Sequence, residues 1–276
     1  MTDPAVGRAA EEEIVMSPGA DGRNGSGGPL AGAVVAVAGA GGPAGRATLC
    51  RLAGSGATLV GCDADAERLA ESVNAARAAG GGAIPVTGDT VDLLDPHAAR
   101  AWAESIEKDY GRVDGLVHLV GGWRGSRSFA TTDLADWTVL HDLLLRTVQH
   151  TSLAFDEPLR RSGRGRFVLV SAAGASQPTA GNAAYAAAKA GAEAWTLAMA
   201  DGFRKAGEAE GLDGPAAAAV ILVVKALVND AMREAKPNAK FAGFTDVDDL
   251  ADNIAEVWDR PAQELNGTRL WLTAQP

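Results

Sequence analysis

Short apolar runs alternate with longer alanine-rich stretches along most of the 276-residue chain. The apolar runs, such as VVAV at 34–37 and VILVV at 220–224, are nearly continuous. Strands that helices cover on both faces have this pattern, whereas strands with one solvent face alternate between apolar and polar residues. The pattern predicts strands at 33–38, 57–62, 83–88, 113–120, 165–171, 216–224 and 268–273. It predicts helices at 43–54, 64–79, 95–109, 134–162, 182–206, 229–237 and 246–259.

The alternation of predicted strands and helices indicates one α/β domain. This order is typical of a Rossmann-type, doubly wound sheet of parallel strands, here seven, with helices on both faces. Residues 1–30 are instead rich in Gly, Pro, Asp and Glu, a composition that buries too little apolar surface to order itself. We therefore expect a disordered tail at 1–30 and a single domain at 31–276.

Composition and charge narrow the range of partners. The chain is 47% hydrophobic and 22% charged, with a net charge of −10, and this charge would repel nucleic acids and anionic membranes. The longest apolar run is too short to span a bilayer, and no secretory signal is visible, so we expect a cytoplasmic protein. Cys50 and Cys62 are expected to be buried thiols, and the four histidines are too scattered to predict a metal site.

Between the first predicted strand and the first predicted helix lies the glycine-rich stretch AGAGGPAG, residues 38–45. Such a turn presents bare backbone and the free N–H groups of a helix start to a nucleotide pyrophosphate. Pro43 fits the first helical turn but removes one of these N–H groups, which should weaken binding by about 1–3 kcal/mol without abolishing it. The predicted cofactor-binding glycines are Gly39, Gly41, Gly42 and Gly45.

Two carboxylates follow the second and third predicted strands. Asp63 comes 24 residues after Gly39, where a carboxylate can accept hydrogen bonds from the adenosine ribose and repel a 2′-phosphate. No Lys or Arg lies within 61–67, so the sequence favours NAD over NADP. Asp89 is a candidate to reach the adenine, although a residue in a surface turn fits its position equally well.

The stretch AAYAAAKAG at 183–191 places Tyr185 and Lys189 four residues apart on one face of a predicted helix. A phenol with a pKa of about 10 is a poor acid or base at neutral pH. A neighbouring ammonium favours the phenolate and would lower that pKa, as a proton donor to a carbonyl oxygen requires. The alternative is a pair on the helix surface without a catalytic role.

Taken together, these segments resemble the short-chain dehydrogenase/reductase family over about residues 31–273. The resemblance depends on the glycine turn 39–45, Asp63, the pair Tyr185-x-x-x-Lys189 and the strand RFVLVS at 166–171. It implies an NAD(P)-dependent oxidoreductase that interconverts an alcohol and a ketone or aldehyde. It also implies that Tyr185 is the catalytic acid–base and that Lys189 binds the nicotinamide ribose.

The family also has a serine that orients the substrate oxygen. The usual spacing before the tyrosine places Ala172 at that position, whereas the local sequence SAAG places Ser171 there. We predict Ser171, with Ser176 in the same loop as a further candidate.

The chain departs from the family pattern mainly around the cofactor. The family's NNAG reads HLVG at 118–121, and the asparagine of its long helix falls on Leu144. After the sixth strand, Lys225-Ala226 replaces the family's Pro-Gly, and Asp230 replaces its carboxamide-binding threonine. Two functions therefore remain open: an active NAD-dependent oxidoreductase, or a catalytically impaired binding or scaffold protein. The Tyr–Lys pair and Asp63 favour the first, and His118 is expected to pack at a strand end.

Two segments are candidates for substrate contact. The loop 121–129 carries Trp123, Arg124 and Arg127, which could line a pocket for an acidic or aromatic substrate or lie in solvent. The segment 229–245 lies where the family has its substrate lid, with Met232, Phe241 and Phe244 as apolar contacts. By the resemblance we expect a homo-oligomer, a tetramer or a dimer, formed through the helices at 134–162 and 182–206.

Overall fold

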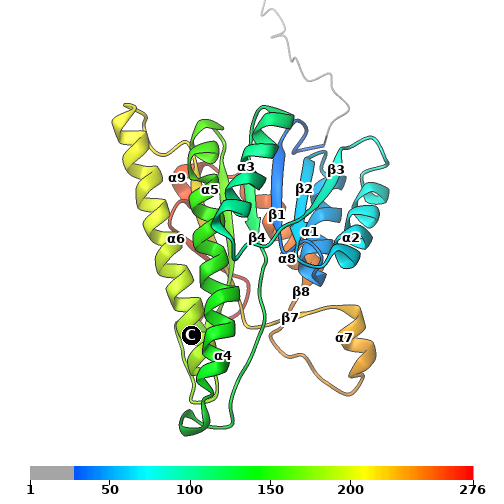
Figure 1. The fold of residues 1–276 in the computed structure, drawn as a ribbon, viewed down its shortest axis with the longest axis vertical. Coiled ribbons are helices and arrows are strands. Elements are labelled where there is room, and N and C mark those ends of the chain that lie inside the picture. Colours follow the sequence, from blue (N-terminus) through cyan, green and yellow to red (C-terminus); the bar gives the residue numbers. More distant parts are fainter. Residues whose placement is uncertain (1–27, 276) are drawn as a thin grey trace, which may run out of the picture.

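The computed structural model describes residues 28–275 as a parallel sheet with helices on both faces (Figure 1). The seven strands lie in the order β3-β2-β1-β4-β5-β6-β9, and all neighbours pair in parallel. This is the doubly wound α/β fold that the sequence predicts. The strands are β1 Val34–Ala38, β2 Thr58–Asp63, β3 Val86–Thr90, β4 Gly115–His118, β5 Arg166–Ala172, β6 Ala218–Val224 and β9 Arg269–Trp271.

Alternate side chains of the central strands enter two separate cores. On β1, Val35 and Val37 belong to the core formed with one set of helices, while Val34 and Ala36 belong to the core on the other face. The first set is α1 Pro43–Gly54, α2 Ala66–Ala79 and α8 Val247–Glu256. The second set is α3 Pro96–Tyr110, α5 Thr147–Arg161 and α6 Ala183–Ala209. Burial on both faces explains the nearly continuous apolar runs of these strands.

The structure differs from the predicted elements mainly in two places. The third strand begins at Val86 rather than at residue 83, directly after Pro85, which has no N–H to donate to a strand ladder. The predicted helix at 134–162 is α4 Leu134–His141 and α5, joined by a π-helical segment, Asp142–Arg146. Short additional elements are β7 Leu227–Val228, α7 Asp230–Ala235, β8 Thr245–Asp246 and α9 Ala262–Leu265.

The domain begins slightly earlier than the sequence indicates. Leu30, which was assigned to the predicted tail, is 2% exposed and its N–H donates to the carbonyl oxygen of Ser55 at 2.9 Å. The rest of the predicted tail, residues 1–27, lies outside the described residues. Cys50 lies half-buried in α1, and Cys62 is buried in β2. In the part of the chain that the structure describes, no helix is both long and apolar enough to cross a membrane.

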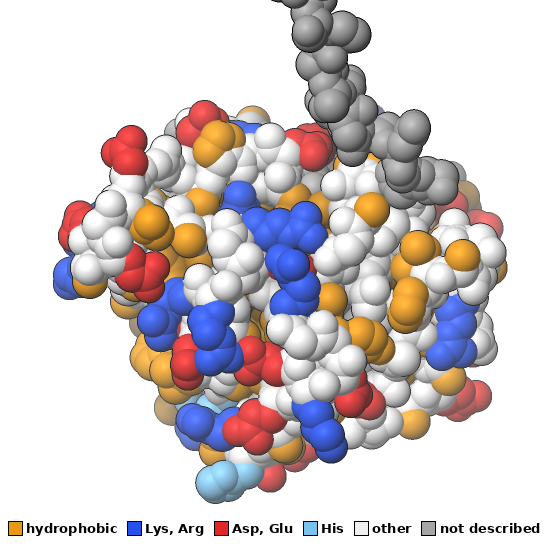
Figure 2. Space-filling model, turned by 90° about the horizontal axis from the view of Figure 1, so that it is seen from above, with side chains coloured by type: hydrophobic (Ala, Val, Ile, Leu, Met, Phe, Trp, Pro, Cys, Tyr) orange, Lys and Arg blue, Asp and Glu red, His pale blue; other side chains and the backbone are white. Residues whose placement is uncertain are grey.

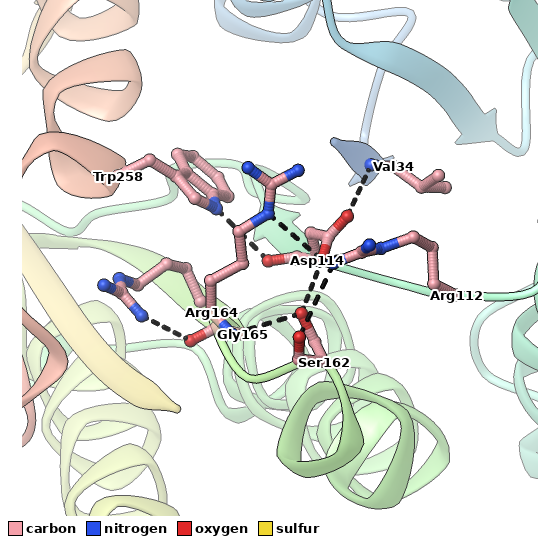
Figure 3. Close-up of polar contacts among 8 residues, drawn as sticks. Val34, Arg112, Asp114, Ser162, Arg164, Gly165 and Trp258 are labelled. Carbon is pink, nitrogen blue, oxygen red and sulfur yellow. Dashed lines mark hydrogen bonds and ion pairs between the residues drawn. The ribbon is translucent and has the colours of Figure 1, made fainter. Parts of the chain in front are cut away.

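Asp114, just before β4, joins several elements at the amino-terminal edge of the sheet (Figure 3). Its Oδ2 accepts from the Val34 N–H of β1 at 2.9 Å, and its Oδ1 accepts from Arg112 and from the Ser162 hydroxyl. Its carbonyl oxygen accepts from Trp258 Nε1 at 3.2 Å. Burial alone would raise the pKa of this carboxyl, but the hydrogen bonds from Arg112, Ser162 and Val34 outweigh burial and lower it.

Basic side chains are concentrated at the same edge. Arg164 lies 3.4 Å from Asp114 Oδ1, and the buried Arg166 donates to the carbonyl oxygens of Val257 and Arg260. Figure 2, which looks onto this edge, shows Lys and Arg side chains gathered near its centre. The edge thus ties strands and helices together through the buried Asp114 carboxylate and the buried Arg166, with the more exposed Arg112 and Arg164 around them.

Candidate active site

A cavity of about 770 Å³ opens at the opposite edge, where the carboxyl ends of β1, β4, β5 and β6 meet. Its walls come from the glycine turn before α1, the segment 118–123 after β4, the end of β5, the first turns of α6 and the segment after β6. In open α/β sheets, ligands bind at this edge, where the strand order reverses on either side of the first strand. The structure thus brings five segments that are far apart in the sequence to the walls of one cavity.

The glycine turn folds as the sequence predicts, and two of its glycines are sterically required. Gly39 has φ of 80°, and a Cβ there would lie 2.7 Å from the Val120 nitrogen. A Cβ on Gly45 would overlap the carbonyl oxygen of Gly39. Gly42 is the N-cap of α1, and a Cβ there would make only an ordinary contact, 3.6 Å from the same oxygen. The turn therefore presents backbone rather than side chains to the cavity.

Pro43 is the first residue of α1, so one N–H of the helix start is missing. The first helical bond is donated by Arg46 to Gly42. Ala44 and Gly45 line the cavity, and their N–H groups find no acceptor among the described residues. Two free N–H groups at a helix start can bind an anion.

Asp63 ends β2 close to the glycine turn. Its Oδ2 accepts from the Gly41 N–H at 2.9 Å, and its Oδ1 accepts from the Asp65 N–H at 3.0 Å. The N–H of Gly41, predicted to bind cofactor, is therefore directed to Asp63. A Cβ on Gly41 would lie 3.0 Å from the carboxylate, which explains why glycine fits here.

Arg68 is a cavity residue that the sequence reasoning missed, because it lies one position beyond the window 61–67. Its Nε donates to Asp65 Oδ2 at 2.8 Å, and its Nη2 lies 3.8 Å from Asp63 Oδ1. Its position in the first turn of α2, whose N-cap is Asp65, was the signal available in the sequence. By contrast, Asp89 is solvent-exposed on β3 and does not belong to the described lining of the cavity.

Tyr185 and Lys189 lie in the first turns of α6, and both line the cavity. Lys189 is 8% exposed, and its Nζ donates to the carbonyl oxygen of Val170 on β5 at 2.8 Å. Burial lowers the pKa of this ammonium to about 8. The pair is therefore part of the cavity wall rather than of an exposed helix surface.

The sequence predicts that Lys189 lowers the pKa of the Tyr185 phenol, and for this structure that prediction is wrong. Burial raises the pKa of Tyr185 to about 12, because the phenolate is the form that loses hydration. The ammonium is directed to the Val170 carbonyl oxygen, and its charge does not offset this loss. At neutral pH Tyr185 is thus a neutral phenol, the form that donates a proton.

The three positions considered for the substrate-orienting serine have different surroundings. Ser171 is 1% exposed, and its hydroxyl donates to Glu193 Oε1 of α6 at 2.6 Å. Ala172 lies next to it on the cavity wall. Ser176 is exposed in the turn that follows. The hydroxyl predicted to hold the substrate is thus directed to a buried carboxylate, Glu193, which the sequence reasoning did not single out.

His118 and Leu144 occupy the positions where the chain departs from the family pattern. His118 is 1% exposed at the end of β4; its Nε2 lies 3.2 Å from Thr147 Oγ1 and its Nδ1 3.1 Å from Thr151 Oγ1. Burial, together with the charge of Lys189, lowers the pKa of His118 to about 3, so the ring is neutral. Leu144 is buried in the π-helical segment and packs with Ala188.

The predicted substrate segments contribute unequally to the cavity. Trp123 lines it and remains 70% exposed, whereas Arg124 pairs with Asp136 at 3.3 Å.

From the predicted lid, Met232 and Phe244 line the cavity, and the Phe241 ring contacts that of Phe244 at 5.7 Å between centroids. Lys225 lines the cavity and donates to the Ala242 carbonyl oxygen at 2.9 Å. Arg127 is exposed and lies off the described lining.

Comparison with known proteins adds a match that includes the glycine turn, Asp63 and the Tyr185–Lys189 pair. A family model described as short chain dehydrogenase matches residues 33–207. The chain is 30% identical over 168 residues to the acetoacetyl-CoA reductase of Allochromatium vinosum. The matched residues make up 60% of this chain and 67% of that protein. For three of the curated relatives the match spans 60% to 67% of the relative's length.

Two solved structures with bound nucleotides have a similar fold. One is NAD+-bound xylitol dehydrogenase, with a TM-score of 0.74 and 18% identity over 89% of this chain and 99% of that one. The other is a short chain dehydrogenase from Burkholderia cenocepacia J2315 in complex with NADP. It has a TM-score of 0.73 and 25% sequence identity, and the match covers 89% of this chain and 98% of that one. The two differ in the nucleotide they bind.

Proposed function

The chain belongs to the short-chain dehydrogenase/reductase family of oxidoreductases, which use nicotinamide cofactors, and from that premise we propose that it transfers hydride between NAD(H) and an alcohol or carbonyl carbon. The observation that carries the proposal is the placement of Tyr185 and Lys189 on the wall of a large cavity at the carboxyl edge of the sheet. A neutral phenol and a buried ammonium at this edge are suited to proton transfer at a substrate oxygen.

The residues around the glycine turn fit a dinucleotide. The N–H groups of Ala44 and Gly45 and the bare backbone at Gly42 would hold the pyrophosphate, with Gly39 and Gly45 allowing the close approach. Asp63 would accept hydrogen bonds from the adenosine ribose, since each carboxylate oxygen retains a free lone pair. We propose NAD as the preferred cofactor for this reason, while Arg68 reduces the repulsion of a 2′-phosphate.

The side chains of the chain itself would handle the proton. A bound nicotinamide supplies or accepts the hydride. Tyr185 would donate its proton to the carbonyl oxygen as the alcohol forms. Burial keeps the phenol protonated at neutral pH, although its raised pKa also makes it a weaker acid. Lys189 would bind the nicotinamide ribose and oppose the negative charge that remains on Tyr185 after transfer. Ser171 could reach the substrate oxygen only by leaving Glu193.

The cavity favours a substrate with an apolar body next to its carbonyl group. Trp123, Met232 and Phe244 supply apolar surface around the space that faces Tyr185, and Lys225 is a cation at its rim. Because one relative is an acetoacetyl-CoA reductase, 3-oxoacyl thioesters are the first class to test, followed by other ketones and secondary alcohols. Assembly into a homo-oligomer stays a prediction.

A second candidate function is a binding or scaffold protein with little turnover. It is favoured by Pro43, which removes one phosphate-binding N–H, and by the Ser171 hydroxyl, which is bound to Glu193. The two functions differ in cofactor affinity, because a scaffold needs no nicotinamide. Calorimetry with NAD separates them: micromolar binding supports the oxidoreductase, and millimolar or absent binding supports the scaffold.

The substitution Tyr185→Phe tests the catalytic assignment directly. We expect turnover on a substrate found by NADH depletion to fall about 100- to 10,000-fold, because the proton donor is lost. NAD affinity should stay within a few-fold, since the ring and Lys189 remain. Tyr110→Phe, which changes the other tyrosine of the chain at the end of α3, is the matched control and should keep wild-type rates. A Tyr185→Phe variant with wild-type turnover would contradict the assignment.

A further inference from the structure

Glu193 is a buried carboxylate on the same face of α6 as Tyr185 and Lys189. The three residues follow at intervals of four, so their side chains lie along one side of the helix. The Glu193 side chain is only 4% exposed, and carboxylates this deeply buried are almost always paired. The proton transfer proposed for Tyr185 and Lys189 does not include Glu193.

Side chains from two different strands bind the Glu193 carboxylate. Its Oε1 accepts from the Ser171 hydroxyl at the end of β5, at 2.6 Å. Its Oε2 accepts from Arg269 Nε of the edge strand β9, also at 2.6 Å. Each carboxylate oxygen thus has a hydrogen-bond donor, one of them a guanidinium, and these donors fix the carboxylate next to β5.

Lys189 lies one helical turn before Glu193 and is bonded to an uncharged acceptor, the carbonyl oxygen of Val170. Burial lowers the pKa of Lys189 to about 8, and the charge of Glu193 acts in the opposite direction. The other titratable groups that face Lys189 are His118 of β4 and Tyr185 of α6, and burial leaves both neutral. Glu193 is therefore the charge that opposes deprotonation of this ammonium.

We propose that Glu193 is a positioning residue whose carboxylate, held by Ser171 and Arg269, keeps the Lys189 ammonium charged and sets the alkaline limit of the reaction. The inference rests on the proposed roles of Tyr185 and Lys189. Without the negative charge of Glu193, Lys189 would lose its proton at a lower pH. Tyr185 would then lack the neighbouring ammonium at that lower pH. The alkaline limb of activity then moves to lower pH.

The direct test is titration of Lys189 by NMR of protein labelled at lysine ¹³Cε. The chain has six lysines, and the Lys189 signal is identified by its loss in Lys189→Arg. We expect Glu193→Gln, which keeps the shape and loses the charge, to lower the pKa of Lys189 by about 1. We expect Arg269→Gln to raise it, because Glu193 then lacks its guanidinium partner. Glu208→Gln, which removes an exposed charge from the same helix, should leave the titration unchanged.

The opposite directions distinguish this role from a structural one. Lost packing or lost stability would not move one titration down and the other up. The pH profile of kcat should follow the titration, with the alkaline limb lower by about one pH unit in Glu193→Gln and higher in Arg269→Gln. An unchanged Lys189 titration, or shifts of the same sign in both variants, overturns the proposal. If Glu193→Gln does not fold, the proposal is tested by Arg269→Gln alone: a raised Lys189 pKa supports it, and an unchanged or lowered pKa overturns it.

The two proposals can fail separately. The NMR titration needs neither substrate nor cofactor, so it tests the link between Glu193 and Lys189 whatever the reaction is. If the titrations move as expected while Tyr185→Phe keeps full turnover, the proposed function fails. If turnover is lost in Tyr185→Phe while the titrations stay fixed, the role of Glu193 fails.

Discussion

Opposite charges lie side by side where the adenosine end of a dinucleotide would bind. Asp63 accepts hydrogen bonds from Gly41 and Asp65, and Arg68 lies 3.8 Å from the same carboxylate. The carboxylate is 13% exposed and the guanidinium 58%. The more buried charge acts through a medium that screens it less, so Asp63 should dominate and favour NAD.

Removing the Asp63 charge should reverse the cofactor preference. In Asp63→Asn, Arg68 would keep Asp65 as its partner but would no longer lie beside a second carboxylate, and we expect NADP affinity to rise at least 10-fold relative to NAD affinity. Adding Arg68→Ala should cancel this gain. Calorimetric dissociation constants for both nucleotides provide the measurement, with Glu67→Gln, an exposed carboxylate on α2, as control. Tighter binding of NADP than of NAD by the unmodified protein would contradict the argument.

The sequence predicts that Tyr185 and Lys189 share one face of a helix, but it does not predict the surroundings of the candidate site residues. The four-residue spacing of Tyr185 and Lys189 fixes a shared helix face, and both line the cavity. The environment of Ser171 depends on strand register at the end of β5, where a shift of one residue turns a side chain to the other face. The effect of burial on the Tyr185 phenol depends on tertiary packing, which local spacing does not reveal.

At the scale of elements, the start of α1 would decide how well the cavity holds the phosphates of the proposed cofactor. Two free N–H groups remain there, and Pro43 takes the place of a third. Proline at the first helical position also stabilises the helix start, because its φ is already helical. One residue thus has opposite effects on stability and on anion binding.

Pro43→Ala should therefore tighten cofactor binding and slightly lower stability. Restoring one N–H to a charged acceptor is worth about 1–3 kcal/mol, so we expect NAD to bind about 10-fold more tightly. The free energy of unfolding should fall by less than about 1 kcal/mol. Calorimetry and thermal unfolding measure the two effects. Pro96→Ala, at the first position of α3, should lower stability similarly without changing NAD affinity.

The sequence predicts the central strands β1, β2, β4, β5 and β6 well because burial on both faces gives them nearly uninterrupted apolar runs. It misplaces β3, in which only Val86 is buried and which begins directly after Pro85. It also treats 134–162 as one regular helix. The π-helical segment at Asp142–Arg146 depends on how α4 and α5 pack against α6, and apolar spacing carries no signal for it.

At the scale of the whole molecule, the two edges of the sheet have different tasks. The carboxyl edge holds the cavity, and the amino edge holds Asp114 with the Val34 amide, Arg112, Ser162 and Arg164. Because the pKa of Asp114 is lowered in the fold, its contribution to stability is present above the pKa of an unfolded aspartate. That contribution is lost as the pH falls through the lower folded value.

Asp114→Asn should destabilise the fold without affecting the cavity. The variant keeps an acceptor for Val34 but leaves Arg112 and Arg164 without a counter-charge, and we expect a loss of about 2 kcal/mol. The loss should begin to shrink as the pH falls below about 4, the pKa of an unfolded aspartate, and should vanish below the lower pKa of the folded carboxyl. Urea unfolding at several pH values measures it. Asp156→Asn, in a half-exposed pair with Arg160 on one helix, should cost less, about 0.5 kcal/mol. A large change in NAD affinity would contradict the separation of tasks.

The ammonium beneath Tyr185 also bears on how this chain could diverge. A buried lysine with a lowered pKa makes folding less favourable at neutral pH, because the ammonium loses its hydration. An apolar residue of similar length at position 189 would remove this cost. A descendant that served only as a scaffold would gain stability by losing it. Natural variants that retain lysine at position 189 would then be those in which selection still acts on proton transfer.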